Sequence, residues 1–178
     1  MSYDPRQRPS RIFPVNRSAA AWLGFRRQMH DRYVRRSKEQ KGRQPVSKID
    51  HVKTHIEVEN KHDMEAMLAT LVDENPIRDE VAGQTYRGRD AVAKRYGDLW
   101  EAFPDFTVTP TGLYEDGDVV IMQADYFGTH KGAFNDHPPT GNSFNVRIVV
   151  VFNFEGDSIA SEIIYLDYAG QLRQLGLM

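Results

Sequence analysis

The sequence predicts an α+β fold in which three helices come first and an antiparallel sheet follows. Between residues 49 and 103 the apolar residues recur three and four positions apart, which is the spacing of a helix face. From residue 106 onward the chain alternates or runs apolar over lengths typical of strands, with tight turn sequences between them. Helices followed by strands that pair through hairpins define an α+β architecture.

The first 45 residues differ in charge from the rest of the chain. They carry 12 Lys and Arg against 3 acids, whereas residues 46–178 carry 11 against 22. Residues 18–40 also place large apolar side chains at helical spacing, namely Trp22, Phe25, Met29 and Tyr33. We expect a basic extension with one amphipathic helix over residues 1–45 and one main domain over residues 46–178. The extension either contacts an anionic surface or another protein, or is a solvated arm.

Three helices are expected at the start of the main domain. Their apolar positions are Ile49, Val52 and Ile56 in the first, Met64, Met67, Leu68 and Leu71 in the second, and Val92, Tyr96, Leu99, Trp100 and Phe103 in the third. Pro104 stops the third helix, because proline cannot continue the backbone hydrogen bonding of a helix. The stretch from Asn75 to Gly88 is interpreted as irregular.

Four strands are expected after the third helix, near residues 106–115, 118–129, 143–154 and 158–166, and a short helix over residues 171–177 closes the chain. Acid-rich turns that contain glycine separate the first two strands and the last two. In the third strand Ile148, Val150, Phe152 and Phe154 point one way, yet Val149 and Val151 on the other face are also apolar.

A sheet with two apolar faces needs cover on both sides. We expect the helices to cover one face and a second copy of the protein to cover the other, because large exposed apolar patches usually mark interfaces. The sequence therefore predicts a homodimer. In the alternative, the basic N-terminal helix folds back over the outer face.

The amino-acid composition and the motifs of the sequence limit which kinds of functional site the protein can have. The 178 residues, 40% of them apolar, are enough for one core of ordinary size. Cysteine is absent from the sequence, which excludes disulfides and thiolate metal sites. No run reaches the roughly 20 apolar residues that cross a bilayer, so we expect a cytoplasmic protein with no transmembrane segment. No Walker loop, dinucleotide fingerprint or Gly-x-Ser-x-Gly elbow occurs, and we expect no cofactor.

A row of His and Glu side chains follows the first helix. His51 and His55 are four residues apart, a spacing that can hold a metal ion, and Glu59 and His62 come after them. The apolar side of this helix is formed by other residues, so we expect the row to be largely solvated. The sequence therefore predicts no metal site.

Asp167 is the candidate centre of the chemistry, because it follows an apolar strand at its junction with the closing helix. A charged side chain in such a place is costly unless something uses or compensates it. In one hypothesis an apolar pocket raises its pKa and Asp167 acts as a general acid and base. In the other it caps the closing helix, where amide donors and the helix dipole lower its pKa.

Further candidate residues have a functional and a structural interpretation. His130 ends a strand, where it either orients a substrate carbonyl and assists proton transfer or anchors the loop that follows. Tyr165 shares a strand face with Asp167, so its hydroxyl either reaches the same cavity or belongs to an ordinary core tyrosine. Trp100 and Phe103 either form an aromatic wall for a planar ligand or only pack in the core.

Three stretches of the main domain resemble the SnoaL-like polyketide cyclases. They are Tyr86-Arg87-Gly88-Arg89-Asp90-Ala91-Val92 leading to Phe103-Pro104-Asp105, Gly128-Thr129-His130-Lys131-Gly132 with Pro138-Pro139-Thr140-Gly141, and Tyr165-Leu166-Asp167 followed by Leu172-Arg173-Gln174-Leu175-Gly176. The resemblance covers residues 48–177. It implies the nuclear transport factor 2-like fold, a cone of three helices packed on a curved antiparallel sheet with a pocket at its mouth.

The resemblance also implies a function. In the characterised cyclases an acid on the last strand, matched here by Asp167, serves as general acid and base in a ring closure without cofactor. Those cyclases carry polar side chains on the preceding strand, where this chain has Ile148 and Val150, so we expect a drier pocket. The prediction is a cyclase or isomerase that acts by general acid–base catalysis on a small apolar carbonyl compound. Its catalytic residues would be Asp167, His130 and Tyr165, and its substrate-binding residues Trp100, Phe103, Ile148 and Val150. The alternative is a non-catalytic protein that binds an apolar ligand.

Overall fold

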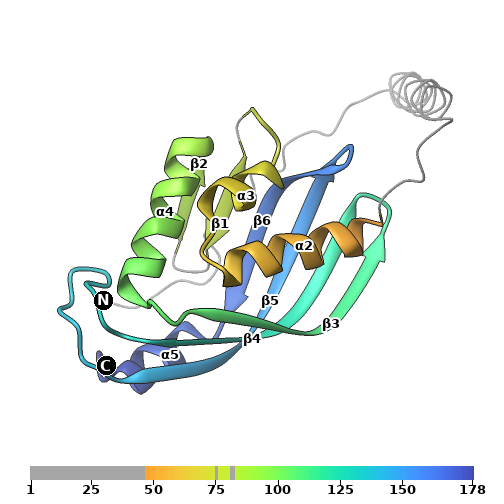
Figure 1. The fold of residues 1–178 in the computed structure, drawn as a ribbon. Helices are drawn as coiled ribbons and strands as arrows, with labels where there is room; N and C mark the ends of the chain where they lie inside the picture. Colours follow the sequence, from red (N-terminus) through yellow and green to blue (C-terminus); the bar gives the residue numbers. More distant parts are fainter. Residues whose placement is uncertain (1–46, 75, 81–82) are drawn as a thin grey trace, which may run out of the picture. The chain divides into compact units, whose positions relative to one another are not determined.

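The computed structural model describes residues 47–74, 76–80 and 83–178 (Figure 1). The basic extension predicted over residues 1–45, with its helix, lies outside the described residues.

The three predicted helices of the main domain are confirmed. They are α2 (Lys48–Asn60), α3 (Met64–Ala69) and α4 (Arg89–Ala102). Asp63 begins α3, because its carboxylate accepts a hydrogen bond from the backbone N–H of Ala66 at 3.0 Å and so satisfies a free amide of the first turn. The last turn of α4 ends at Phe103, directly before Pro104.

The four predicted strands are also confirmed, as β3 (Thr107–Asp116), β4 (Val119–Thr129), β5 (Ser143–Glu155) and β6 (Ser158–Leu166). Consecutive strands of this set pair antiparallel. The closing helix α5 (Tyr168–Leu175) begins earlier than predicted.

The interpretation of residues 75–88 as irregular was wrong. This stretch contains β1 (Ile77–Glu80) and β2 (Gln84–Arg87), and β1 pairs in parallel with β6. The strand order across the sheet is therefore β2-β1-β6-β5-β4-β3. Each of the two added strands has four residues and carries charged side chains, so neither shows the apolar alternation by which a strand is recognised.

One face of the sheet packs against the helices. Figure 1 shows α2, α3 and α4 on the same side of the curved sheet. The side chains of β5 that were predicted to share a face, Ile148, Val150, Phe152 and Phe154, are all buried in this core. None of the helices in the described part of the chain is long and apolar enough to span a membrane.

Apolar side chains form a row across the other face of the sheet. The strand register places Tyr114 beside Ile121, Ile121 beside Val151, and Val151 beside Ile163. Tyr114 is 58% exposed and Ile121 is 40% exposed. A row that crosses four strands is a continuous apolar surface, which is the kind of patch that marks an interface. The homodimer stays a prediction.

If a second copy covers this row, the protein has a mass in solution of twice the 20.4 kDa of one chain. Ile121→Lys then shifts the protein to the monomer, because the substitution places a charge at the centre of the apolar contact. Light scattering after size-exclusion chromatography measures the mass. Lys53→Glu, on the exposed side of α2, is the control and leaves the mass unchanged. A wild-type protein that is monomeric at high concentration contradicts the homodimer.

Candidate functional site

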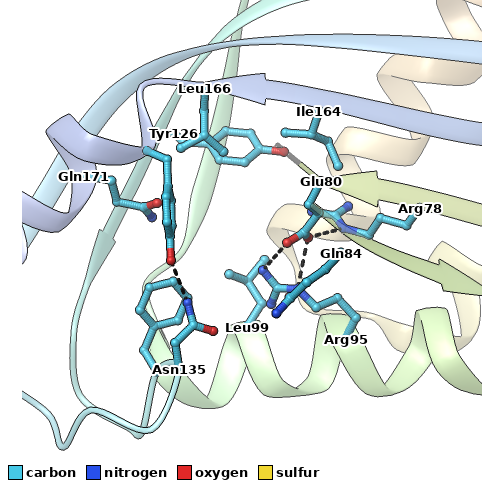
Figure 2. A pocket seen from close by; sticks show the side chains of 12 residues that line it. Arg78, Glu80, Gln84, Arg95, Leu99, Tyr126, Asn135, Ile164, Leu166 and Gln171 are labelled. Atoms are coloured by element: carbon cyan, nitrogen blue, oxygen red, sulfur yellow. Dashed lines mark hydrogen bonds and ion pairs between the residues drawn. The ribbon is translucent and has the colours of Figure 1, made fainter. Parts of the chain in front are cut away.

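A small cavity lies between the helices and the inner face of the sheet, and most of the residues that line it have polar side chains (Figure 2). Its volume is about 40 Å³. A water molecule needs roughly 10–15 Å³ of such space, so the cavity admits a very small molecule or one end of a larger molecule. The polar lining residues are Arg78, Glu80, Gln84, Arg95, Tyr126, Asn135, Tyr168 and Gln171, and the apolar ones are Leu99, Phe134, Ile164 and Leu166.

Glu80 lies between two guanidinium groups on the cavity wall. Its Oε1 accepts hydrogen bonds from Nε of Arg78 at 2.9 Å and from Nε of Arg95 at 3.0 Å, and its Oε2 accepts from Nη2 of Arg95 at 3.0 Å. Burial alone would raise the pKa of Glu80, but the two arginines outweigh burial and lower it. Glu80 is therefore ionised at neutral pH, and Oε2 keeps one lone pair free.

Arg78 joins the cavity wall to the buried interior. It is 3% exposed, and its Nη1 donates to Tyr96 at 2.8 Å and to Glu162 at 2.9 Å. Burial alone would lower the pKa of Arg78, but Tyr96, Glu80 and Glu162 raise it well above its usual value. Arg78 is thus a permanent cation, held from the cavity side by Glu80 and from the interior by Glu162.

Two hydrogen-bond donors in the cavity wall have no partner in the part of the chain that the structure describes. Among the described residues, Nη2 of Arg78 donates to none, because its hydrogen bonds all involve Nε and Nη1. The hydroxyl of Tyr126 likewise makes no hydrogen bond within the described part of the chain, and Figure 2 shows it pointing toward the side of the cavity that holds Glu80. Burial and the neighbouring Glu59 raise the pKa of Tyr126 far above its usual value, so this hydroxyl keeps its proton. Both groups can donate to an oxygen of a ligand.

A larger hollow of about 410 Å³ adjoins the cavity. Arg95, Phe134 and Asn135 line both spaces, so the two spaces lie on either side of these three side chains. We call this space the outer hollow; its other lining residues are Tyr86, Asp98, Glu101, Ala133 and Asp136.

The His and Glu row of α2 does not lie in solvent, and that expectation was wrong. His55 is 0% exposed and Glu59 is 1% exposed. Both side chains face the same interior as Val52 and Ile56, because positions 52, 55, 56 and 59 fall on one side of the helix. Burial raises the pKa of Glu59 to about 8 and lowers the pKa of His55. Within the described residues no group of three or more His, Asp or Glu could hold a metal ion.

Asp167 is not inside an apolar pocket, which corrects the environment expected for it. Its side chain is exposed, and Oδ1 accepts a hydrogen bond from the backbone N–H of Gly170 at 2.8 Å at the start of α5. A Cβ atom on Gly170 would lie 2.2 Å from Oδ2 of Asp167, so only glycine leaves room for this carboxylate. The structure thus gives Asp167 the capping contact that the sequence analysis considered as its second role.

Tyr165 lies beside Asp167, as the alternation of the last strand predicted. Both line an open groove of about 570 Å³ on the outer face of the sheet, together with Gln123, Asp125 and Arg147. Tyr165 is 53% exposed and does not contribute to the core. Of the described residues that line this groove, Leu166 alone also lines the inner cavity.

His130 lies neither in the cavity nor in the outer groove. It is 0% exposed, and its ring packs against Phe103 and Phe134. The backbone N–H of Thr140 donates to its Nδ1 at 3.3 Å, and its own backbone bonds to residues 141 and 142. These contacts are those of a histidine that anchors the loop after β4. A Cβ at Gly132 would lie 2.3 Å from the carbonyl oxygen of Glu101, so this loop also packs directly on the end of α4.

The four residues predicted to bind substrate belong to the core. Trp100, Phe103 and Val150 are buried and line none of the three spaces, whereas Ile148 is buried and borders the outer groove. The structure therefore does not bring the predicted catalytic and substrate-binding residues into one site. Their roles in a reaction stay predictions.

The sequence analysis missed the residues that form the cavity wall, chiefly Arg78, Glu80 and Tyr126. One signal was present in the last strand, where Glu162 interrupts an apolar run two residues before Ile164. Placing Glu162 on the inner face would have predicted a buried carboxylate that needs a cation. Arg78 is the cation that pairs with it.

Known proteins resemble this chain in sequence and in fold. Residues 49–175 match the family model described as SnoaL-like polyketide cyclase. No curated protein sequence matches the chain.

Solved structures share its fold at low sequence identity. A proposed SnoaL-like polyketide cyclase from Jannaschia sp. CCS1 has a TM-score of 0.69 and 19% identity, over 76% of this chain and 97% of that chain. IdmH from Streptomyces antibioticus, a proposed polyketide cyclase, has a TM-score of 0.63 and 22% identity, over 74% and 99%. An NTF2-like protein of unknown function from Burkholderia pseudomallei has a TM-score of 0.61 and 18% identity, over 73% and 98%. The α+β fold is therefore NTF2-like.

The capping contact of Asp167 makes a prediction about stability. Asp167→Ala lowers the free energy of unfolding by about 1 kcal/mol, because it leaves an amide of α5 without its partner. Gly170→Ala has a smaller effect: its Cβ displaces the carboxylate, but alanine in a helix is more stable than glycine by about 0.5–1 kcal/mol, which offsets part of the loss. Asp167→Asn changes stability little, since Asn also caps helices. Urea unfolding measures all three, and an unchanged midpoint in Asp167→Ala would contradict the capping role.

Proposed function

This chain belongs to the SnoaL-like polyketide cyclase family, and on that premise we propose that it catalyses cofactor-independent acid–base chemistry on a 1,3-dicarbonyl compound in the inner cavity. One observation carries the proposal: the ionised Glu80 shares the cavity wall with Nη2 of Arg78 and the hydroxyl of Tyr126, two donors that have no partner among the described residues. A base beside donors is the arrangement that enolate chemistry needs.

Glu80 is the only carboxylate among the described residues that line the cavity, and Oε2 is its available atom. The neighbouring arginines lower the pKa of Glu80, which makes it a weak base. A weak base removes a proton efficiently only from an acidic carbon. A carbon between two carbonyl groups is much more acidic than a carbon next to one, and this favours a 1,3-dicarbonyl substrate over a simple ketone.

The two donors stabilise the charge that develops when the proton leaves. A carbonyl oxygen placed between Arg78 and Tyr126 becomes an enolate oxygen, and both donors are held in place before the reaction begins. In a cyclisation the enolate carbon then attacks a further carbonyl group of the same molecule, one that lies outside the 1,3-dicarbonyl unit, and that carbonyl oxygen becomes an alkoxide. The protonated Glu80 returns its proton to the new alkoxide in a cyclisation, or to a different carbon in an isomerisation.

The two adjoining spaces suggest how such a substrate would lie. The dicarbonyl end would enter the cavity of about 40 Å³, and the remainder would occupy the outer hollow of about 410 Å³. The wall is more polar than the sequence predicted, because β1 supplies Arg78 and Glu80. An oxygen-rich compound therefore fits this lining better than the apolar compound first expected.

A second candidate function is binding of an oxygen-rich ligand without turnover. It is favoured by the hydrogen bonds that already hold Glu80, since a carboxylate clamped by two guanidinium groups is a poor proton acceptor. Both functions use the same cavity, so they are separated by whether a bound ligand exchanges its acidic proton.

Deuterium exchange tests the proposal. We expect the wild-type protein to accelerate the incorporation of solvent deuterium at the carbon between the carbonyls in a panel of substituted 1,3-diketones, followed by NMR. Glu80→Gln lowers this rate by about 10²–10⁴-fold because the base is lost. Tyr126→Phe lowers it by about 10²–10³-fold because an oxyanion donor is lost.

Asp79→Asn is the matched control, since Asp79 neighbours Glu80 on β1 but bonds to Thr85 and does not line the cavity. Binding in the wild type with no exchange above background supports the binding protein. Asp167→Asn tests the other placement of the reaction. Exchange that is lost in Asp167→Asn and kept in Glu80→Gln would move the reaction to the outer groove.

A further inference from the structure

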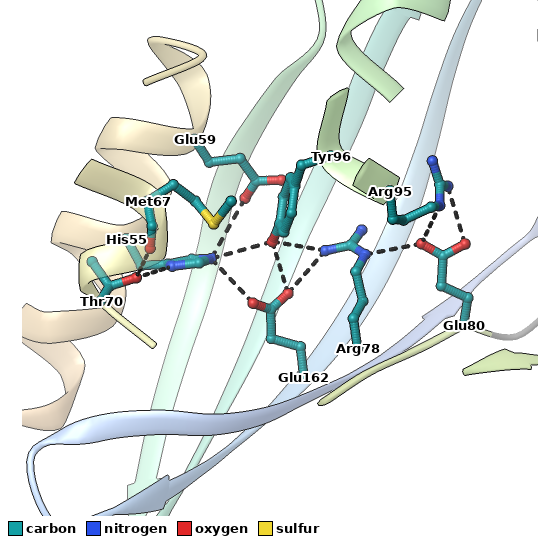
Figure 3. A network of polar contacts seen from close by, with 9 residues as sticks. All are labelled: His55, Glu59, Met67, Thr70, Arg78, Glu80, Arg95, Tyr96 and Glu162. Carbon is teal, nitrogen blue, oxygen red and sulfur yellow. Dashed lines mark hydrogen bonds and ion pairs between the residues drawn. The ribbon is translucent and has the colours of Figure 1, made fainter. Parts of the chain in front are cut away.

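Behind the cavity wall lies a buried group of ionisable side chains that the proposed reaction does not use (Figure 3). We call His55, Glu59 and Glu162 the inner acid cluster. They come from α2 and β6, and their exposed fractions are 0%, 1% and 3%. Figure 3 shows the cluster on one side of Tyr96 and Arg78, with Glu80 and Arg95 on the other. Arg78 thus links the cluster to the cavity.

Hydrogen bonding determines which nitrogen of His55 carries a proton. The hydroxyl of Thr70 donates its only hydrogen to the carbonyl oxygen of Met67 at 2.6 Å. The Nδ1 atom of His55 lies 2.6 Å from the same hydroxyl oxygen, which can then only accept. Nδ1 therefore carries a hydrogen, and in a neutral imidazole the other nitrogen, Nε2, is a bare acceptor.

Nε2 of His55 faces two carboxyl groups. It lies 3.4 Å from Oε1 of Glu162 and 4.0 Å from Oε2 of Glu59. Tyr96 is also 3.4 Å away, but its single hydrogen has a shorter contact with Oε2 of Glu162, at 2.9 Å. If all three groups were deprotonated, three acceptors would face one another out of contact with water, which is strongly unfavourable.

The cluster therefore holds one additional proton. Burial lowers the pKa of His55 and raises that of Glu59 to about 8, which favours Glu59 as the carrier of this proton at neutral pH. Oε2 of Glu59 lies 4.0 Å from Nε2 of His55, beyond hydrogen-bond distance, so the proton removes a negative charge from the cluster and does not form a bond to His55. Glu162 is then the carboxylate that pairs with Arg78, at 2.9 Å. In this state Glu162 is the one charged carboxylate of the cluster, and its charge balances that of the Arg78 guanidinium.

We propose that this buried proton positions Arg78 at the cavity wall, so that His55, Glu59 and Glu162 are positioning residues for the site. Loss of the proton leaves two buried carboxylates against one guanidinium. The added negative charge attracts Arg78 inward and weakens its contact with Glu80. The inference rests on the proposed function only in that Arg78 belongs to the reaction site; the coupling itself needs no substrate.

The other ionisable groups around the cluster are accounted for. His51 of α2, Tyr96 of α4 and Tyr126 of β4 lie near the cluster. Glu80 of β1 and Arg95 of α4 lie on the far side of Arg78. Burial raises the pKa of both tyrosines far above their usual values, and both arginines stay charged. Glu59 is thus the group in the cluster that changes charge slightly above neutral pH.

The experiment follows stability and Arg78 together between about pH 6.5 and about pH 9. The pKa of Glu59 is higher in the folded protein than in the unfolded chain, so the folded state binds a proton that the unfolded state has lost. Stability is therefore lost as pH rises through the folded pKa of about 8. The unfolding equilibrium constant of the wild type rises by about tenfold per pH unit below this pKa and levels off above it.

Arg78 is observed directly by the NMR signal of its side-chain Nε–H. In the wild type this signal shifts with the same midpoint as the Glu59 carboxyl carbon. In Glu59→Gln the side chain at position 59 is uncharged at all pH values. The pH-dependent shift of the Arg78 signal and the tenfold change of the unfolding equilibrium constant per pH unit therefore both disappear. Glu57→Gln is the matched control, because Glu57 is on the exposed side of α2, paired with Lys61. It leaves both pH dependences as in the wild type.

An Arg78 signal that stays constant while Glu59 titrates would overturn the proposal. An Arg78 signal in Glu59→Gln that still shifts with the wild-type midpoint would overturn it as well. If Glu59→Gln does not fold, the wild-type titration alone still decides, since it records both residues. A wild-type protein that shows no deuterium exchange, but whose Arg78 signal still follows Glu59, would instead count against the proposed function and support this inference.

Discussion

The buried guanidinium of Arg78 is the constraint on which the rest of the interior depends. A cation at this depth is tolerated only with well-placed partners, and Glu162 of β6 and Glu80 of β1 supply them. The pairing with Glu162 also joins β1 to β6, the only parallel pair among the strands that the structure describes. Removing one partner from a buried ion pair typically costs about 3–5 kcal/mol, so these acids cannot vary independently of Arg78.

The same arrangement bears on the chemistry proposed for the cavity. In that reaction Arg78, which is held from both sides, would meet a ligand through Nη2 without moving, and preorganised donors of this kind stabilise developing negative charge more effectively than water does. The interior has a cost: Oε1 of Glu59 and Nε1 of Trp100 have no hydrogen-bond partner among the described residues. A polar interior of this kind remains sensitive to its protonation state.

Much of the fold was predictable from local pattern, and much of the site was not. The helices and the four long strands have clear periodicity, and their predicted positions were confirmed within a few residues. The last strand shows why the site was missed. Ile163 and Tyr165 on one face and Ile164 and Leu166 on the other are equally apolar, so alternation alone could not say that Glu162 points inward and Asp167 does not. On α2, His55 and Glu59 look like surface residues until their partners are known.

The sequence by itself determined the fold class, the order of the long elements and the family, because these depend on periodicity and on motifs that are local in the chain. Only the tertiary structure decided which face of the last strand is internal and where the charges meet. Arg78 and Glu162 are separated by 84 positions in the sequence but form one hydrogen bond of 2.9 Å. Such a pair forms because burial makes each charge require the other, and burial is a property of the assembled fold rather than of either segment.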